Sequence, residues 1–140
     1  MKLTNEDKEL ISLATEVVKS NCDIYPKPSM HVGCVIKAKS GKIYKGINIY
    51  TSHSICAEQV AFGQAWANGE REFDTVVAVK MEDDKSVDVI SPCGVCRYMF
   101  DKFMVDINVI VKDPKNDKIL KVKAQELLPY AFKRVRPTKN

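Results

Sequence analysis

The stretch Asp74-Thr75-Val76-Val77-Ala78-Val79 is short, apolar and rich in β-branched residues, a pattern typical of a strand buried on both faces of a sheet. The sequence predicts a helix on either side of it, over residues 56–68, where Asn68-Gly69 forms the stop, and over residues 93–103. A buried strand between two helices indicates an α/β domain, in which helices cover the faces of a sheet.

The elements further from this stretch complete the same pattern. Residues 5–20 place apolar side chains at helical spacing, and Thr4 with Asp7 forms an approximate capping box at their start. The turn at Ser40-Gly41 predicts a hairpin. The predicted strands are residues 31–38, 42–50, 74–79, 106–111 and 118–122, followed by a helical turn at 124–128. A hairpin followed by alternating helices and strands predicts a layered α/β domain with a five-stranded mixed sheet.

Length and composition fit one globular domain. The chain has 140 residues, of which 45% are hydrophobic and 29% charged, enough for a single buried core. We expect one domain over residues 1–132 and a basic tail over 133–140. The net charge is only +4, and no stripe of basic residues alternates with aromatic ones. Nucleic acid is therefore not expected as a partner.

The N-terminal residues and the number of cysteines indicate the cellular compartment of the protein. The first ten residues, MKLTNEDKEL, are polar and acidic rather than signal-like, and no apolar run is long enough to span a membrane. We therefore expect a cytoplasmic protein without a membrane partner. The chain has 5 cysteines, an odd number, so a disulfide framework is not expected there. A Cys-x-x-Cys pair in that compartment indicates a metal or redox site.

Two motifs carry the chemistry. Cys56-Ala57-Glu58 begins one predicted helix and Pro92-Cys93-Gly94-Val95-Cys96-Arg97 begins the other, with 36 residues between Cys56 and Cys93. The sulfurs of Cys93 and Cys96 can share a helix face, and the positive end of a helix is expected to lower the pKa of the Cys56 thiol. Three thiolates can hold Zn²⁺ and leave its fourth position open for water. The carboxylate of Glu58 can then carry protons to and from that water.

These motifs set two physical demands. Positions i and i+2 of an ideal helix lie about 200° apart, so Cys56 and Glu58 share a site only if Cys56 sits at the helix cap or Glu58 reaches around the first turn. Three thiolates around Zn²⁺ also leave a net negative charge. We expect Arg97 to offset part of it through hydrogen bonds to the sulfurs.

Two other interpretations use the same cysteines. A thioredoxin-like redox site would need only the Cys-x-x-Cys pair and would leave Cys56 and Glu58 without a role. A closed structural zinc site would need a fourth protein ligand. The candidates for that ligand are His31, His53, Cys22 and Cys34. None has a diagnostic spacing, and the complete pattern favours the open, catalytic zinc site.

With both motifs in this order, the sequence resembles the cytidine deaminase superfamily, in the branch that acts on free nucleosides. The likeness covers nearly the whole chain, including residues 41–50, 74–79, 111–113 and 126–129. It implies a three-layer α/β/α sandwich and one Zn²⁺ per chain, held by Cys56, Cys93 and Cys96. It also implies that Glu58 carries protons while an activated water attacks C4 of the cytosine ring and ammonia leaves.

One departure from the superfamily bears on the substrate. Cytidine deaminases usually carry Asn-x-Glu on the second strand, where this chain has Asn48-Ile49-Tyr50. Alternate strand residues share a face, so Asn48 and Tyr50 are both expected to contact the substrate. The pattern is most similar to that of blasticidin S deaminases, which carry a tyrosine in this place. This favours a blasticidin S-like nucleoside over plain cytidine.

Other positions follow from the same resemblance. Met30 stands where cytidine deaminases often have a phenylalanine against the base, and Phe132 stands where a side chain can close over a neighbouring subunit's site. Ser29 and Ala57 are further expected substrate contacts. Gln59 replaces an arginine that bonds to the thiolates in many bacterial enzymes, which leaves that task to Arg97.

We therefore predict a zinc-dependent aminohydrolase that converts the cytosine ring of a free nucleoside or nucleoside analogue to uracil and releases ammonia. The resemblance implies a homotetramer or a dimer. Cytidine or deoxycytidine as substrate is one alternative. A non-catalytic zinc-stabilised binding module is another.

Overall fold

The structure is a computed structural model that describes residues 1–21 and 31–132. The predicted substrate contacts Ser29 and Met30, the candidate ligand Cys22 and the basic tail at 133–140 lie outside the described residues. The elements are α1 (Asn5–Asn21), β1 (His31–Ala38), β2 (Ile43–Ile47), α2 (Ala57–Ala67), β3 (Phe73–Met81), β4 (Val87–Ile90), α3 (Gly94–Phe103), β5 (Asn108–Lys112), β6 (Ile119–Lys123) and a 3₁₀ turn, η2 (Ala124–Leu127).

The five predicted strands form one mixed sheet in the order β2-β1-β3-β5-β6. β1 is antiparallel to both β2 and β3, β3 and β5 are parallel, and β5 and β6 are antiparallel. The sheet also contains a strand that the sequence analysis missed. This strand, β4, pairs antiparallel with the second half of β3. Its four residues, Val87-Asp88-Val89-Ile90, are the shortest run over which an alternating pattern indicates a strand, and the alternation ends at Ile90.

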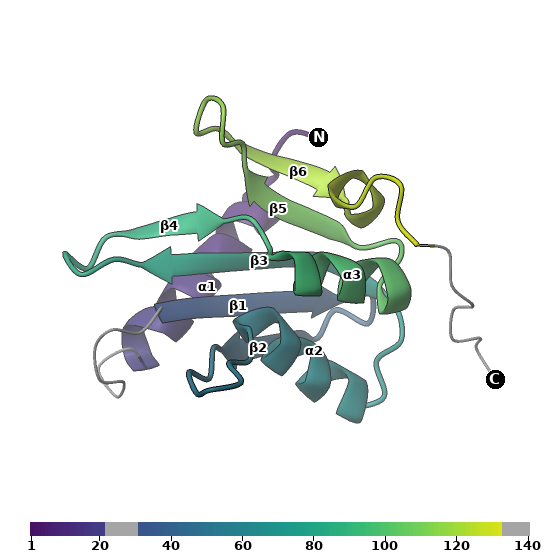
Figure 1. Ribbon diagram of the computed structural model, residues 1–140, viewed down its shortest axis with the longest axis horizontal. Helices are drawn as coiled ribbons and strands as arrows, with labels where there is room; N and C mark the ends of the chain where they lie inside the picture. Colours follow the sequence, from purple (N-terminus) through teal and green to yellow (C-terminus); the bar gives the residue numbers. More distant parts are fainter. Residues whose placement is uncertain (22–30, 133–140) are drawn as a thin grey trace.

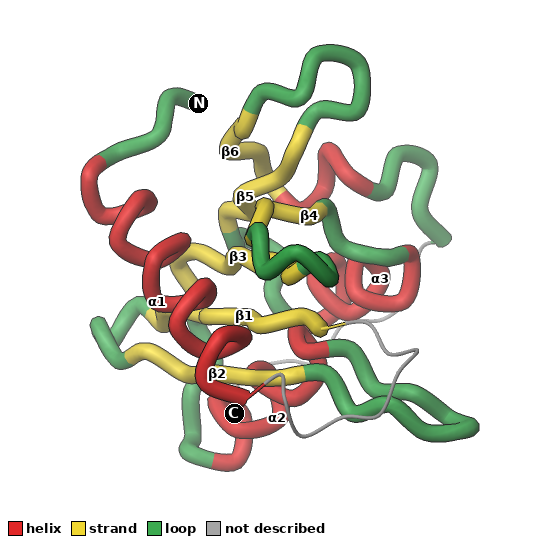
Figure 2. The backbone as a smooth tube through the Cα atoms, turned by 90° about the vertical axis from the view of Figure 1, so that its left-hand side faces the viewer, coloured by secondary structure: helices red, strands yellow, loops and turns green. Residues whose placement is uncertain are grey.

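Helices cover both faces of the sheet, so the predicted three-layer α/β/α sandwich is confirmed. Figure 1 shows α1 behind the sheet and α2 and α3 in front of it, and Figure 2 shows the same layers from the side. Each face has its own core. On β1, Val35 packs in the cluster beneath α1, whereas Cys34 and Ile36 pack in the cluster beneath α2 and α3.

Gly46 lets the first turn of α2 lie directly against β2. A Cβ atom at this position would lie 2.2 Å from the carbonyl oxygen of Ala57 and 2.6 Å from the backbone nitrogen of Ala61. Any larger residue would therefore push α2 away from the sheet. Because Ala57 follows Cys56 directly, this contact sets how far the first motif stands from the sheet.

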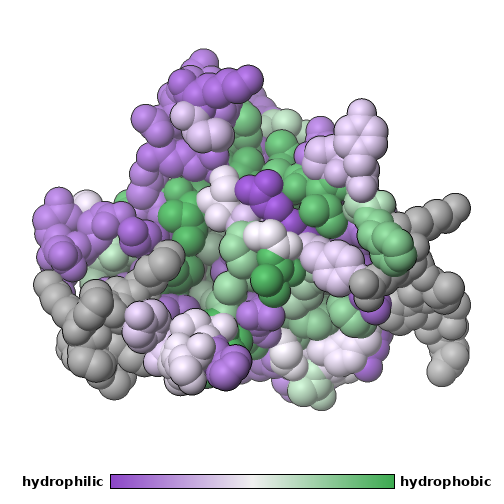
Figure 3. Space-filling view, viewed as in Figure 1, coloured by the Kyte–Doolittle hydropathy of each residue, from purple (hydrophilic) through white to green (hydrophobic). Residues whose placement is uncertain are grey.

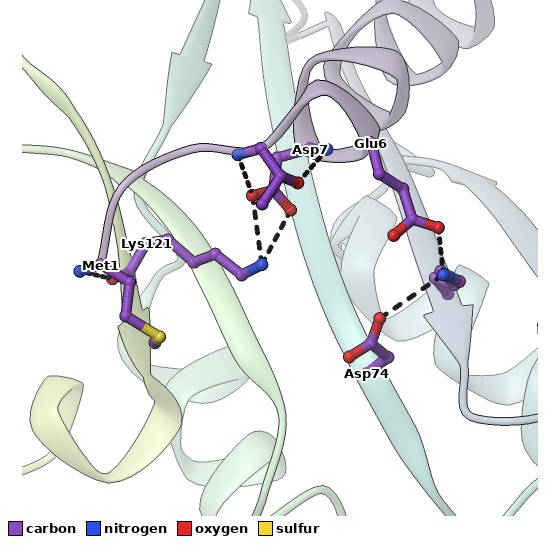
Figure 4. Close-up of polar contacts among 7 residues, drawn as sticks. Met1, Glu6, Asp7, Asp74 and Lys121 are labelled. Carbon is purple, nitrogen blue, oxygen red and sulfur yellow. Dashed lines mark hydrogen bonds and ion pairs between the residues drawn. The ribbon is translucent and has the colours of Figure 1, made fainter.

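The start of α1 is anchored to the sheet by polar contacts (Figure 4). The N–H of Thr4 donates to Asp7 Oδ2 at 2.8 Å and the N–H of Asp7 donates to Thr4 Oγ1 at 3.1 Å, which confirms the predicted capping box. Lys121 Nζ on β6 lies 3.0 Å from Asp7 Oδ1, and Lys37 on β1 pairs with Glu6. These contacts fix α1 on the face of the sheet opposite α2 and α3.

The face that carries α2 and α3 is mixed in character. Figure 3 shows hydrophobic and hydrophilic residues side by side in the middle of this face, and mostly hydrophilic ones over its upper and left-hand parts. Within residues 1–21 and 31–132, no helix combines the length and the apolar character needed to cross a membrane.

Candidate metal centre and pocket

The first cysteine of each motif occupies a helix cap rather than a helical turn. Cys56 is the N-cap of α2, with φ −69° and ψ 148°, and Cys93 is the N-cap of α3, with φ −69° and ψ 171°. Because Cys56 precedes the helix in extended backbone, its side chain is not held 200° from that of Glu58. Cys56 therefore sits at the helix cap, which is the condition under which it can share a site with Glu58. Gln59 contributes here, because its Oε1 accepts the N–H of Cys56 at 3.0 Å.

The structure brings the three predicted metal ligands together. The sulfurs of Cys56 and Cys93 are 3.5 Å apart, and the sulfurs of Cys56, Cys93 and Cys96 all lie within 4.8 Å of one another. Tetrahedral Zn²⁺ with Zn–S bonds of about 2.3 Å places its sulfurs about 3.8 Å apart. The cluster therefore fits Zn²⁺.

A fourth protein ligand does not join this cluster in the described part of the chain. Of the four candidates, His31, His53 and Cys34 are described and lie outside the cluster, while Cys22 is not described. The arrangement therefore favours a site with an open position over a closed structural one.

The electrostatics of the thiols differ from one another. Burial raises the pKa of Cys96 far above its usual range, and burial together with the hydrogen bond to Cys93 raises the pKa of Cys56 to about 11. Burial also raises the pKa of Cys93, but hydrogen bonds from the backbone of Cys96 and from the neighbouring thiols outweigh it and leave this pKa below its usual value. The predicted lowering at a helix start thus occurs at Cys93, and the prediction for Cys56 was wrong because burial and a neighbouring thiolate dominate there. A bound cation would compensate the charge that these groups share.

Glu58 is the buried acid of the site. Its residue is 4% exposed, and burial raises the pKa of its carboxyl above the usual value, although hydrogen bonds from its own backbone N–H and from Cys96 act in the opposite direction. A carboxyl whose pKa is raised by burial holds a proton more readily than an exposed one, which suits a group that both takes up and releases protons. Its position beside the thiols therefore suits a proton carrier.

Arg97 makes its described hydrogen bonds to backbone carbonyls. Its Nε donates to the carbonyl oxygen of Pro92 at 2.8 Å, and its Nη1 donates to the carbonyl oxygen of Leu127 at 3.3 Å. These bonds tie the residue before Cys93 and the η2 turn to α3. The hydrogen bonds from Arg97 to sulfur remain a prediction.

A cavity of about 270 Å³ lies beside the cysteines and Glu58, slightly smaller than the roughly 300–1,000 Å³ usual for small-molecule sites. The predicted contacts Asn48, Tyr50 and Ala57 all line it. Asn48 is buried and Tyr50 is half exposed. Phe132 is 72% exposed and does not line the cavity. The full lining is Val32, Asn48, Tyr50, Ser54, Ile55, Cys56, Ala57, Glu58, Ile90, Ser91 and Cys93.

Several of these lining residues were not predicted from the sequence. Ser54 and Ser91 each stand two residues before a cysteine ligand, a shared spacing that could have drawn attention to them. Ile90 ends the strand that was not predicted. Ile55 is paired with Ile49 in an isolated β-bridge, which places the loop between them at the edge of the cavity.

The fold and the site together define a layered α/β protein with a three-cysteine metal centre and a buried glutamate beside it. The family model described as the cytidine and deoxycytidylate deaminase zinc-binding region matches residues 4–112. The chain belongs to this family of zinc-binding deaminases. Membership confirms the predicted resemblance, the predicted class of enzyme, a zinc-dependent aminohydrolase, and Zn²⁺ as its cofactor.

Individual relatives agree with this assignment. The chain is 35% identical over 139 residues to a blasticidin-S deaminase of Bacillus cereus, covering 94% of this chain and 96% of that protein. It is 36% identical over 115 residues to a cytidine deaminase of Shewanella woodyi, and the match spans 76% of this chain but only 33% of that longer protein. Among solved structures, the cytidine deaminase of Burkholderia pseudomallei superposes with a TM-score of 0.72 at 25% identity, over 93% of this chain and 100% of that one.

Proposed function

We propose that the protein hydrolyses the exocyclic amine from the cytosine ring of a free nucleoside or nucleoside analogue of the blasticidin S type. The observation that carries this proposal is the buried Glu58 on the wall of a cavity that also exposes the thiols of Cys56 and Cys93. An acid and a metal centre beside one small cavity are what hydrolysis of a ring amine requires.

Zn²⁺ bound by the three cysteines would lower the pKa of a water molecule and so supply a nucleophile near neutral pH. Glu58 would accept one proton from that water and deliver it to the ring nitrogen, and the proton left on the attacking oxygen would then pass through the same carboxyl to the departing amine, which leaves as ammonia. One carboxyl serves both transfers because its pKa is raised and bulk water is largely excluded from it. The apolar side chains of Val32, Ile55 and Ile90 line the cavity and suit the faces of a flat ring.

The identity of residue 50 supports the narrower substrate class. Tyr50 lines the cavity together with Asn48. A phenol both donates and accepts hydrogen bonds but is neutral, whereas a carboxylate only accepts and carries a charge. A sugar hydroxyl held by a carboxylate would lose that stronger, charged acceptor here. The relative from Bacillus cereus that matches almost the whole chain is a blasticidin-S deaminase, which also favours this substrate over cytidine or deoxycytidine.

A panel of cytosine nucleosides tests the proposal, with blasticidin S, cytidine and deoxycytidine each followed by the ultraviolet change of deamination. We expect the highest kcat/KM with blasticidin S. A preference for cytidine or deoxycytidine would replace the substrate but keep the chemistry. No turnover of any member would favour the non-catalytic zinc module, and cobalt substitution would then show no exchangeable water.

We also propose that the protein assembles as a homotetramer or a dimer in the cytoplasm. Large hydrophobic side chains are exposed near the cavity at Ile49, Ile55 and Val95, and Phe132 is exposed at the end of the described chain. Exposed apolar groups gathered around a site are typical of an interface. Sedimentation equilibrium tests this assembly, and a mass equal to one chain would contradict it.

A further inference from the structure

The segment that leads to Cys93 lies outside the strand pairings on either side of it. β4 pairs with β3 as far as Ile90, which lies opposite Ala78. β5 pairs with the other half of the same edge of β3, as far as Ile110 opposite Val77. Ser91 and Pro92 follow β4 beyond both pairings, and proline has no N–H to donate. Contacts from outside the ladder must therefore hold this segment.

The hydroxyl of Ser91 supplies one such contact. Ser91 Oγ donates to the carbonyl oxygen of Lys112 at 3.0 Å and accepts the N–H of Lys112 at 3.3 Å. Lys112 is the last residue of β5 and lies beyond the last residue of that strand paired with β3. A single hydroxyl thus forms hydrogen bonds with both the N–H and the carbonyl oxygen of Lys112, as the backbone of a residue on a neighbouring strand would.

A second contact holds the next residue from another side. Arg97 on α3 donates to the carbonyl oxygen of Pro92. The two residues before Cys93 are therefore each fixed to a different element, Ser91 to β5 and Pro92 to α3.

Cys93 depends on this support more than the other ligands do. Cys96 is buried, Cys56 is half-buried and Cys93 is exposed. Core packing therefore holds Cys93 least, and its backbone must fix the position of its sulfur. That backbone begins at Ser91, which lines the same cavity as Cys93.

We propose that Ser91 is a positioning residue for the metal centre: its hydroxyl fastens the segment before Cys93 to the end of β5 and so keeps the sulfur of Cys93 beside those of Cys56 and Cys96, where the three would hold Zn²⁺. The inference rests on the zinc site and does not depend on which nucleoside is the substrate.

The ion pair between Lys112 and Asp88 does not hold β4 to β5 as the Ser91 hydroxyl holds the segment before Cys93. Lys112 Nζ pairs with Asp88 on β4, but the two side chains are 28% and 52% exposed. Exposed ion pairs contribute little and weaken further with salt. Asp88→Asn is therefore expected to leave the metal centre unchanged, which separates the role of Ser91 from a general attachment of β4 to β5.

The test measures the release of zinc from the zinc-loaded protein into an excess of chelator, without substrate. Loss of a group that supports a metal ligand usually weakens metal affinity about 10–100-fold, and we expect Ser91→Ala to release zinc faster by a factor in the same range. Ser91→Thr keeps the hydroxyl and should release zinc at nearly the original rate. Ser86→Ala is the matched control, because the Ser86 hydroxyl bonds to Asp84 at the opposite end of β4.

Two further readouts distinguish positioning from general destabilisation. In the cobalt-substituted protein, the thiolate charge-transfer bands should shift in Ser91→Ala and not in Ser86→Ala. In the unsubstituted protein, the Lys112 amide should exchange slowly with solvent, because Ser91 accepts its hydrogen.

An unchanged rate of zinc release in Ser91→Ala would overturn the inference, as would equal acceleration in Ser86→Ala. Exchange of the Lys112 amide as fast as that of an exposed turn would also overturn it. Absence of deamination in the nucleoside panel would leave the zinc-release result meaningful, so the two proposals fail separately.

Discussion

The side-chain oxygen of Asn48 accepts the backbone N–H of Val32 at 2.9 Å, so the amide expected to contact the substrate also joins the end of β2 to β1. The Asn48 N–H in turn donates to the carbonyl oxygen of Val32 at 3.2 Å. Both residues line the cavity. The amide is therefore oriented by the sheet before any substrate arrives.

Asn48→Ala should lower both stability and substrate binding. Loss of the acceptor leaves the buried N–H of Val32 unpaired, which costs about 1–3 kcal/mol of unfolding free energy, and KM should rise because the oriented amide is gone. Urea unfolding and steady-state kinetics measure the two effects. Asn116→Ala is the control, because Asn116 accepts the N–H of Lys118 in an exposed turn. If the two variants had equal effects, the oriented amide would have no special role.

Glu58→Gln should retain zinc and lose turnover. The amide is close in size to the carboxyl but cannot carry a proton, so kcat should fall at least about 10²–10⁴-fold, the usual contribution of general acid–base catalysis. Metal analysis and deamination rates are measured on the same preparation. Glu82→Gln, on the exposed turn before β4, should behave like the unsubstituted protein. Substantial turnover in Glu58→Gln would remove Glu58 from the mechanism.

Tyr50→Glu should shift substrate preference toward cytidine. The substitution restores a carboxylate next to Asn48 in the cavity lining, where it can accept a hydrogen bond from a sugar hydroxyl. We expect kcat/KM for cytidine to rise relative to that for blasticidin S. Tyr50→Phe removes the hydroxyl without adding a carboxylate and should not produce this shift. An unchanged ratio in Tyr50→Glu would mean that residue 50 does not select the substrate.

The stability of the protein should fall in acid through Asp7. Burial raises the pKa of Asp7, but hydrogen bonds from Thr4 and Lys121 outweigh it and leave the pKa below its usual value. A carboxyl with a lowered folded-state pKa contributes stability above the unfolded-state pKa of about 3.9 and loses it as the pH falls through the folded-state value.

Asp7→Asn should therefore cost about 1–3 kcal/mol near neutral pH, with a difference from the unsubstituted protein that shrinks in acid. Chemical unfolding at a series of pH values measures this difference. Asp113→Asn is the control, because Asp113 Oδ1 accepts the N–H of Lys115 in an exposed turn. A difference that stayed constant into acid would show that the charge of Asp7 does not matter.

The sequence predicted those features that depend on a local pattern of residues, or on residue types that one reaction requires together. The three cysteines and Glu58 were singled out because zinc hydrolysis needs those groups, and the structure brings them together. The capping box of Thr4 and Asp7 was predicted because it is local. Ser91 was missed because its partner, Lys112, is 21 residues away and their contact exists only in the folded sheet. The pKa of Cys56 was misjudged for the same kind of reason, since burial and a neighbouring thiol arise from tertiary packing.

The close contact at Gly46 limits how the substrate specificity of this cavity can change. The start of α2 packs on β2 with no room for even one added carbon at Gly46. The distance of Cys56 from the sheet is therefore fixed by backbone contact. We therefore expect new specificities to arise from exchanges in the loop of residues 50–54, which borders the cavity at Tyr50 and Ser54. Directed evolution confined to that loop should widen the range of accepted nucleosides, while libraries that include position 46 should mostly return unfolded protein.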